Sequence, residues 1–226
     1  MGFFGTPISW PELSPGLMEI VLCGVEGEAD FSGILSSEEI DHIGRLRNRE
    51  RRLEGVAARV ALKRLLLQKG LIDSPSRCSI VPNRLGSPQI RLVGAGGQKT
   101  LPLSCSIAHK RGLVMVCLGL LPGLVCGVDI EEVCERPWRL RRSFAAADDH
   151  RLDEGDLPRS FALLWACKEA ASKAFGLGML MDFKELRIRR KGGSRFTVLQ
   201  RENAVMEGRF FSFGRFAIAF CCRGPV

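Results

Sequence analysis

Two carboxylates stand two positions apart at Asp129 and Glu131, in a short segment that follows an apolar run. If this segment is a strand, alternation places both carboxylates on one face, about 7 Å apart, with Val128 and Ile130 on the other face. Mg²⁺ binds carboxylate oxygens and completes its coordination shell with water and substrate phosphates. The pair is therefore a candidate magnesium site, although an isolated Asp-x-Glu is more often a strand that runs out into solvent.

A second segment, from Trp165 to Gly176, carries two lysines and a glutamate. It is rich in alanine, lacks proline and β-branched residues and ends in glycine, so it predicts a helix that Gly176 terminates. Helical spacing assigns five side chains to one stripe: Trp165, Lys168, Glu169, Ser172 and Lys173. Alone, the i,i+4 pair of Glu169 and Lys173 is more often a solvated salt bridge, worth about a few tenths of a kcal/mol. Combined with the two carboxylates, the stripe implies a metal ion and a polyphosphate.

Length and composition indicate a soluble globular chain. Its 226 residues suffice for one large or two small domains, with 46% hydrophobic and 26% charged residues. No apolar run reaches the length of a membrane span and no signal-like segment opens the chain, so we expect a cytoplasmic protein without a membrane partner. The nine cysteines form no Cys-x-x-Cys pair and no zinc-ligand spacing with histidine. We expect most of them to be small core residues in a reducing compartment.

The elements that must position the two motifs follow from apolar periodicity and turn residues. Residues 17–25 predict a first strand, and the capping box that begins at Ser36 predicts a helical region up to Lys69, divided at Gly44 and Gly55. Further strands are expected at 78–81, 89–93, 103–108, 113–121, 186–190, 195–200, 209–213 and 216–222.

The order of helix, hairpin and closing strands occurs twice, offset by about half the chain. We therefore predict an α+β fold of two similar subdomains related by a pseudo-twofold axis, each a helix packed on a small, mostly antiparallel sheet. The halves are assigned to residues 1–122 and 123–226. A cleft between them, a usual place for a ligand, is expected to have His109 on one wall and Asp129 on the other.

Together, the two motifs resemble the signature of the 4′-phosphopantetheinyl transferases. Gly-Val-Asp129-Ile-Glu131 is followed about 34 residues later by Trp165-x-x-Lys168-Glu169-x-x-x-Lys173, and the pair is far more specific than either motif alone. The likeness extends over most of the chain. The long, two-part chain is similar to the Sfp-type members, which are monomers of two halves, rather than to the short trimeric type.

The resemblance implies an enzyme that transfers the 4′-phosphopantetheine group of coenzyme A to a serine of an apo acyl or peptidyl carrier protein. Such enzymes serve fatty-acid, polyketide or nonribosomal-peptide biosynthesis, and they release adenosine 3′,5′-bisphosphate. It also implies that Asp129, Glu131 and Glu169 bind Mg²⁺. The catalytic residues would then be Asp129, Glu169 and Lys173, with Glu169 as the base, acting directly or through water.

The coenzyme side of the site is expected in the first half. Ser106-Ile-Ala108-His109 resembles the family's Ser-x-Ser-His segment, and Gly86-Ser87-Pro88 resembles its Gly-Lys-Pro turn, so Ala108 and Ser87 each replace a polar or charged group. The family also carries basic residues in the region of the arginine-rich run 45–52, which on its own would be a solvated helix face. The coenzyme-binding residues implied are Arg45, Arg52, Arg59, Ser87, Ala108, His109, Lys168 and Lys173.

Two other functions share some of these features. The net charge of +8 predicts an anionic partner, for which nucleic acid, coenzyme A and an acidic protein all qualify. A metal-dependent nuclease often has lysine two residues after its second carboxylate, but that position is Val133 here. A non-catalytic binder of nucleotides or nucleic acid is the other alternative, which Ala108 and Ser87 leave open. The intact carboxylates favour the transferase, with no nucleic-acid partner.

Overall fold

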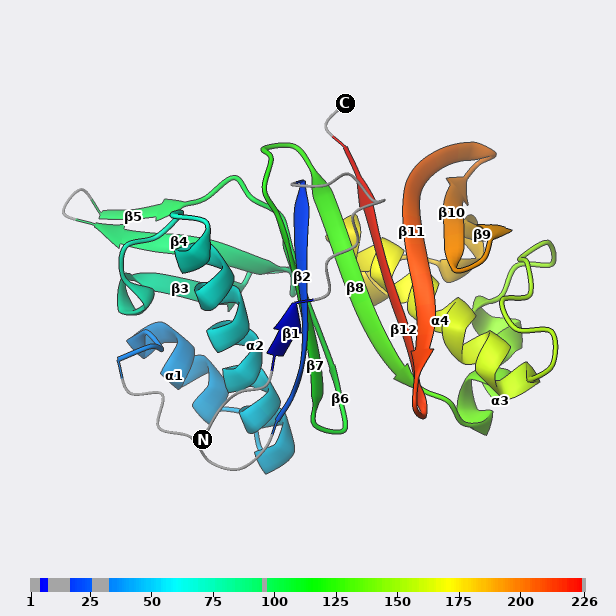
Figure 1. The fold of residues 1–226 in the computed structure, drawn as a ribbon, viewed down its shortest axis with the longest axis horizontal. Coiled ribbons are helices and arrows are strands. Elements are labelled where there is room, and N and C mark those ends of the chain that lie inside the picture. Colours follow the sequence, from blue (N-terminus) through cyan, green and yellow to red (C-terminus); the bar gives the residue numbers. More distant parts are fainter. Residues whose placement is uncertain (1–4, 8–16, 26–32, 95–96, 225–226) are drawn as a thin grey trace. The chain divides into compact units, whose positions relative to one another are not determined.

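The structure is a computed structural model that describes residues 5–7, 17–25, 33–94 and 97–224 (Figure 1). The chain divides into two compact units, Met1–Gly123, called unit 1, and Leu124–Val226, called unit 2. Every strand pair in the described ranges is antiparallel, and both units combine helices with sheets. The predicted α+β class is therefore confirmed, while the pseudo-twofold axis and the cleft between the halves stay predictions.

The described residues of unit 1 form two sheets. The first has the strand order β1-β2-β7-β6, and the second has the order β3-β4-β5. The strands are β1 (Gly5–Pro7), β2 (Met18–Gly24), β3 (Cys78–Pro82), β4 (Pro88–Gly94), β5 (Gly97–Thr100), β6 (Cys105–Lys110) and β7 (Leu113–Gly119). A short 3-10 turn, η1 (Pro75–Arg77), leads into β3.

Two helices pack on the sheets of unit 1. Helix α1 (Ser37–Gly44) begins with the predicted capping box, in which Ser36 and Glu39 each accept a hydrogen bond from the other's backbone N–H. Helix α2 (Arg49–Gln68) begins at Asn48, whose side chain accepts from the N–H of Arg51, and it packs against β2 and β7.

The predicted division at Gly55 is wrong, because Gly55 lies inside α2. A side chain there would meet only ordinary van der Waals contacts, the nearest with Arg59, so nothing in the packing demands a break. The two helices instead separate between Gly44 and Asn48, where the side-chain cap of Asn48 starts a new helix.

Unit 2 has one sheet, with the strand order β8-β12-β11-β10-β9. The strands are β8 (Val125–Glu132), β9 (Leu186–Gly192), β10 (Arg195–Gln200), β11 (Asn203–Phe213) and β12 (Phe216–Arg223). The helices are α3 (Glu135–Phe144) and α4 (Leu157–Ala174), followed by the 3-10 turns η2 (Gly178–Leu180) and η3 (Phe183–Glu185). Helix α3 was not expected from the sequence.

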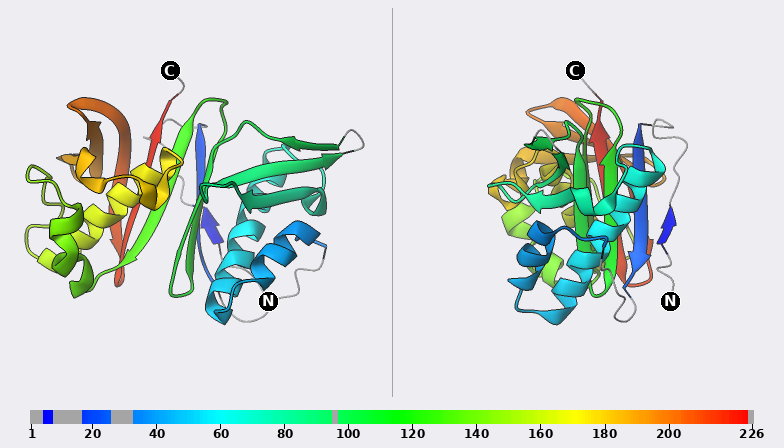
Figure 2. Two further views of the ribbon diagram at one scale, coloured as in Figure 1. Left: turned by 180° about the vertical axis from the view of Figure 1, so that it is seen from behind. Right: turned by 90° about the vertical axis from the view of Figure 1, so that its left-hand side faces the viewer.

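Helix α4 crosses one face of this sheet and packs on β8 and β12 (Figure 2). It begins two turns earlier than the motif suggested, at Asp156, which caps the N–H of Arg159. It ends at Ala174, and Gly176 follows with a φ of +74°, as the predicted terminating glycine should. No helix in the described ranges is long and apolar enough to cross a membrane.

Candidate active site

Three of the predicted site residues meet in unit 2, where β8 lies against α4. The Nζ atom of Lys173 lies 2.6 Å from Oδ1 of Asp129 and 3.4 Å from Oε2 of Glu169. Asp129 is buried, whereas the other two side chains are partly exposed. One lysine ammonium thus stands between two carboxylates that come from different elements.

The close approach of α4 to β8 explains how the three side chains reach one another. Gly127 faces α4, and a Cβ atom at this position would lie 1.9 Å from the carbonyl oxygen of Ala170. Glycine is therefore required there, since no side chain fits between the strand and the helix. Asp129 and Glu131 follow at alternate positions on the same face of β8. Their partners on the neighbouring strand β12 are two small residues, Ala219 and Ala217.

The electrostatics of this cluster favour a bound cation. Burial raises the pKa of Asp129 to about 7; the Lys173 ammonium opposes that rise, while Glu169 and Glu131 add to it. Burial alone would lower the pKa of Lys173, but the carboxylates of Asp129 and Glu169 outweigh it and raise the pKa. The carboxylates repel one another, so a positive charge among them is stabilising.

The predicted magnesium ligands can be compared with this geometry. Asp129 and Glu169 converge on the Lys173 ammonium, which occupies the place of a cation between them, so this pair fits a hard cation. Glu131 acts on Asp129 through its charge, and its Oε1 atom accepts from the N–H of Glu132. Within the described ranges, no group of three His, Cys, Asp or Glu side chains is arranged to hold a metal ion.

Lys168 lies away from this cluster, although it was predicted to bind the coenzyme together with Lys173. Its side chain is fully buried, and its Nζ atom donates to three backbone oxygens and to Oδ2 of Asp149, which lies 2.6 Å away. The backbone acceptors are the carbonyls of Phe144, Phe183 and Leu186, at 3.1, 2.9 and 2.7 Å. Burial lowers the pKa of Lys168, although Asp149 opposes the shift. An ammonium enclosed in this way has no room for a phosphate.

The rest of the predicted helical stripe also has packing roles. Trp165 stacks edge-to-face with Phe144 and Phe183, at ring-centroid distances of 4.8 and 5.5 Å. The hydroxyl of Ser172 donates to the carbonyl oxygen of Gly178, just beyond the end of the helix. Of the five side chains assigned to one face, only Glu169 and Lys173 face Asp129.

On unit 1, His109 is held by a buried carboxylate that sequence reasoning missed. Its Nδ1 atom lies 2.7 Å from Oε2 of Glu54 on α2, and Oε1 of Glu54 accepts from the N–H of Gly112 at 2.9 Å. A carboxylate on one ring nitrogen fixes the orientation of the imidazole. Glu54 lies just after the arginine-rich run 45–52, where an acid carried no signal of its own.

The three predicted arginines differ in their surroundings. Arg45 is exposed at the end of α1, and Arg52 donates to the carbonyl oxygen of Leu46 at 2.9 Å. Arg59 is buried, and it donates from Nε to Ile80 at 3.1 Å and from Nη1 to Gly55 at 2.8 Å. Burial lowers the pKa of Arg59, despite the opposing charge of Glu39. Arg59 is thus engaged in the interior of unit 1 rather than presented to a ligand.

The two positions that depart from the family pattern lie at different depths. Ala108 is buried in β6, paired with Met115 of β7, and offers no polar side chain. Ser87 is partly buried in the turn between β3 and β4, where its backbone N–H donates to Oδ1 of Asn83 at 3.0 Å. Of these two positions, Ser87 carries a side-chain hydroxyl and Ala108 carries none.

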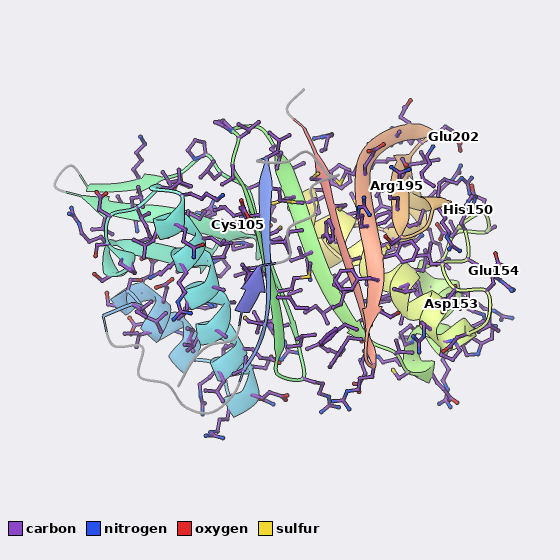
Figure 3. The ribbon with its side chains drawn as sticks, in the orientation of Figure 1. Cys105, His150, Asp153, Glu154, Arg195 and Glu202 are labelled. Carbon is purple, nitrogen blue, oxygen red and sulfur yellow. The ribbon has the colours of Figure 1, made fainter. Side chains whose placement is uncertain are left out.

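A pocket elsewhere on unit 2 contains none of the predicted site residues. It has a volume of about 610 Å³ and is lined by His150, Arg151, Glu154, Arg190 and Gly192. Figure 3 labels His150 and Glu154 on the segment that joins α3 to α4. This pocket is therefore a separate feature from the cluster around Asp129.

Residues 125–221 match the family model of the 4′-phosphopantetheinyl transferase superfamily. The match runs from the first residue of β8 into β12, so it includes Asp129, Glu131, Glu169 and Lys173. No curated protein matches the chain. Residues 125–221 are thus similar to a domain of this superfamily, and that likeness supports phosphopantetheine transfer in general.

Proposed function

We propose that the chain transfers the 4′-phosphopantetheine group of coenzyme A to a serine of an apo acyl or peptidyl carrier protein, in a Mg²⁺-dependent reaction. The observation that carries the proposal is the convergence of Asp129, Glu169 and Lys173 within the segment that matches the superfamily. Neither carboxylates nor lysine alone would be specific. Their meeting at the contact of β8 with α4 supplies anionic and cationic groups at one place.

Asp129, Glu131 and Glu169 would hold Mg²⁺, which supplies neutralisation of pyrophosphate oxygens when it is bound. Lys173 is partly exposed and already faces two carboxylates. When a polyphosphate is present, its ammonium can donate to a phosphate oxygen instead. Phosphoryl transfer depends mainly on such positioning and charge neutralisation.

The proton of the attacking serine needs an acceptor, and Glu169 is the proposed base, acting directly or through water. The serine oxygen forms a bond to the β-phosphorus of coenzyme A as its proton passes to the carboxylate. The bond between that phosphorus and the bridging oxygen breaks, and adenosine 3′,5′-bisphosphate leaves with the bonding electrons. Glu169 is partly exposed on α4, which a base for a large protein substrate requires.

We assign the nucleotide end of coenzyme A to unit 1, with His109 on the 3′-phosphate. The contact of His109 with the buried Glu54 supports this role, because it holds the ring in one orientation. Arg45, Arg52 and Ser87 remain proposed coenzyme contacts. The enclosed Lys168 and Arg59 are left out, and Ala108 can contribute only backbone contacts.

The substrate protein is proposed to be an acidic carrier of fatty-acid, polyketide or nonribosomal-peptide biosynthesis. The net charge of +8 would attract such a carrier and raise the encounter rate more than the affinity. We further propose an Sfp-type, two-half monomer in the cytoplasm, with the nucleotide side in residues 1–122 and the metal side in residues 123–226.

The test is incubation of the protein with coenzyme A, Mg²⁺ and a panel of apo carrier proteins, followed by mass measurement of each carrier. A carrier should gain the mass of one phosphopantetheine group, and Asp129→Asn should abolish the gain. If no carrier gains mass although the protein binds coenzyme A, the non-catalytic alternative replaces this proposal. Cleavage of added DNA or RNA that Asp129→Asn abolishes would favour the nuclease instead.

A further inference from the structure

The buried ammonium of Lys168 joins four separate parts of unit 2. Besides Asp149, it binds the carbonyl oxygens of Phe144 at the end of α3, Phe183 in η3 and Leu186 at the start of β9. An ammonium has three protons, and all its neighbours here are oxygens, so the side chain is fully engaged. Lys168 therefore connects α4 to α3, to the segment after α3, to η3 and to β9.

Asp149 extends the same connection. Its Oδ2 atom accepts from the N–H of Ala146 at 2.7 Å as well as from Lys168, and its Oδ1 atom accepts from the N–H of Ile188 at 2.8 Å. The carboxylate thereby ties the segment after α3 to β9. Buried ion pairs are stable only when their remaining hydrogen-bonding capacity is used, and this pair meets that condition.

The opposite side of α4 is fixed by close packing. Ala170 and Ala174 press against Gly127 of β8, where no Cβ atom would fit. The helix is thus held by β8 on one side and by the bonds of Lys168 to Phe144, Phe183 and Leu186 on the other. Glu169 and Lys173 lie between these two supports on the helix circumference, and they reach Asp129 from there.

Small rotations of α4 would separate these groups. A rotation of about 20° moves a side-chain end that lies about 6 Å from the helix axis by about 2 Å. Functional groups must be held within about 0.5 Å of their productive positions. Packing of alanines on glycine resists close approach but does little against rotation, because small side chains interlock weakly. The directional bonds of Lys168, together with the stacking of Trp165 on Phe144 and Phe183, supply a constraint on rotation.

Unit 1 contains the same kind of connection without the catalytic groups. Lys63 of α2 is buried, and its Nζ atom lies 2.5 Å from Oε2 of Glu39 and 2.8 Å from the carbonyl oxygen of Ile34. Oε1 of Glu39 accepts from the N–H of Ile80 in β3, as Asp149 accepts from Ile188 in β9. The positions that correspond to Glu169 and Lys173, counted from the lysine, are Arg64 and Gln68, both exposed.

We propose that Lys168 and Asp149 are positioning residues, which fix the rotation of α4 about its axis so that Glu169 and Lys173 face Asp129. This inference rests on the proposed function, because it assigns the position of the metal and base groups to a pair that touches neither substrate nor metal. The pair in unit 1 holds a helix without such groups. It therefore provides a control that shares the structural role and lacks the functional one.

The experiment compares Asp149→Asn with Glu39→Gln, which each remove one buried carboxylate from an equivalent pair. Both variants should unfold at a lower temperature. Asp149→Asn should also raise the Mg²⁺ concentration for half-maximal transfer about tenfold or more, as loss of a group that orients metal ligands does. Glu39→Gln should leave that concentration within about twofold, since Glu39 lies far from the proposed ligands in the sequence and belongs to unit 1, whereas the ligands belong to unit 2.

A second measurement does not depend on transfer. The Mg²⁺-induced rise in unfolding temperature without coenzyme A should be smaller for Asp149→Asn than for the wild type, and unchanged for Glu39→Gln. If Asp149→Asn fails to fold, Lys168→Met/Asp149→Leu replaces it, because apolar replacement of a buried ion pair is often tolerated. Equal Mg²⁺ responses in both folded variants would overturn the positioning role. Absence of transfer by the wild type, with its Mg²⁺ response intact, would instead contradict the proposed function alone.

Discussion

The ammonium of Lys173 lies 2.6 Å from the buried carboxylate of Asp129, across the contact between α4 and β8. This distance joins two motifs that are far apart in the sequence. It also places a positive charge where the proposed reaction requires one, among carboxylates that would otherwise repel each other.

Glu169→Gln should separate a metal ligand or base from an ordinary helix salt bridge. The substitution keeps the shape of the side chain but removes its charge, so transfer should fall by at least about a hundredfold. Stability should change little or rise slightly, because a carboxylate that repels Asp129 is lost. Steady-state assays at saturating Mg²⁺ measure the transfer rate, and thermal unfolding of the same samples measures the stability. Near-normal transfer would overturn the assignment of Glu169.

Asp129→Asn combined with Glu169→Gln tests whether the two carboxylates act through one ion. Each single variant should lose activity to a similar extent. The double variant should lose far less than the product of the two losses, because the second substitution removes a group from an ion that is already displaced. Transfer rates of all four proteins supply the comparison, and fully multiplicative losses would show that the two groups act independently.

The stability of the metal-free protein should depend on pH through Asp129. Its pKa rises from 3.8 to about 7 in the folded chain, chiefly by burial. The folded state therefore favours the protonated carboxyl of Asp129. The resulting contribution to the free energy of unfolding is complete below about pH 4 and is lost as the pH rises through about 7. The unfolding temperature of the wild type, measured relative to that of Asp129→Asn, should therefore fall between pH 4 and pH 8, and the ion pair of Asp129 with Lys173 offsets part of that fall. Thermal unfolding at both pH values, without Mg²⁺, measures this.

Added Mg²⁺ provides the control for that comparison. At pH 8 it should raise the unfolding temperature of the wild type and leave Asp129→Asn nearly unchanged, because only the wild type has the full set of carboxylates. A difference in unfolding temperature between the wild type and Asp129→Asn that is the same at pH 4 and pH 8 without metal would contradict the raised pKa.

The sequence predicted much of the fold because its signals were local. Strand β10 has the expected bounds, and the C-terminal end of α4 follows from its terminating glycine, whereas the start of α4 at the Asp156 cap was not predicted. Helix α3 was missed because arginines and a proline interrupt its apolar pattern. Gly55 was read as a helix break, although a long helix tolerates one buried glycine at a cost of about 1 kcal/mol.

The candidate site could be predicted only in part. The identities of Asp129, Glu169 and Lys173 follow from their motifs, but the direction of Lys168 does not. At 3.6 residues per turn, Lys168 and Lys173 lie about 140° apart around the helix, so the proposed stripe was too wide to be one face. Lys168 points into the interior because its partner Asp149, which is distant in the sequence, lies there. The spacing of residues within the helix contains no information about such partners.

His109→Ala tests the proposed contact with the 3′-phosphate. The substitution should weaken binding of coenzyme A more than binding of 3′-dephospho-coenzyme A, because the imidazole has nothing to contact once that phosphate is absent. Glu54→Gln should cause a smaller change in the same direction, since it loosens the orientation of the ring. Calorimetric titration of each variant with both ligands gives the ratio of its affinities for coenzyme A and for 3′-dephospho-coenzyme A. His150→Ala, a histidine of unit 2 outside the proposed site, serves as the control, and equal losses for both ligands would exclude the contact.

Gly127→Ala tests whether the close approach of β8 to α4 is needed for the site. The added methyl group would lie 1.9 Å from the carbonyl oxygen of Ala170 and 2.8 Å from the backbone nitrogen of Ala174, both of them rigid helix backbone. The helix must therefore shift away from the strand, which should cost about 1–3 kcal/mol or more of unfolding free energy. Because Lys173 moves with the helix, the variant that remains folded should also lose most of its transfer activity.

Gly55→Ala is the matched control, since it adds the same methyl group to a buried glycine of α2. Its nearest neighbour would be Nη1 of Arg59 at 3.5 Å, an ordinary contact with a flexible side chain. Alanine favours the helix over glycine, so this variant should be as stable as the wild type or up to about 1 kcal/mol more stable. Chemical denaturation and transfer assays on both variants complete the comparison. If Gly127→Ala proves as stable and active as Gly55→Ala, the positions of β8 and α4 are not what joins Lys173 to Asp129.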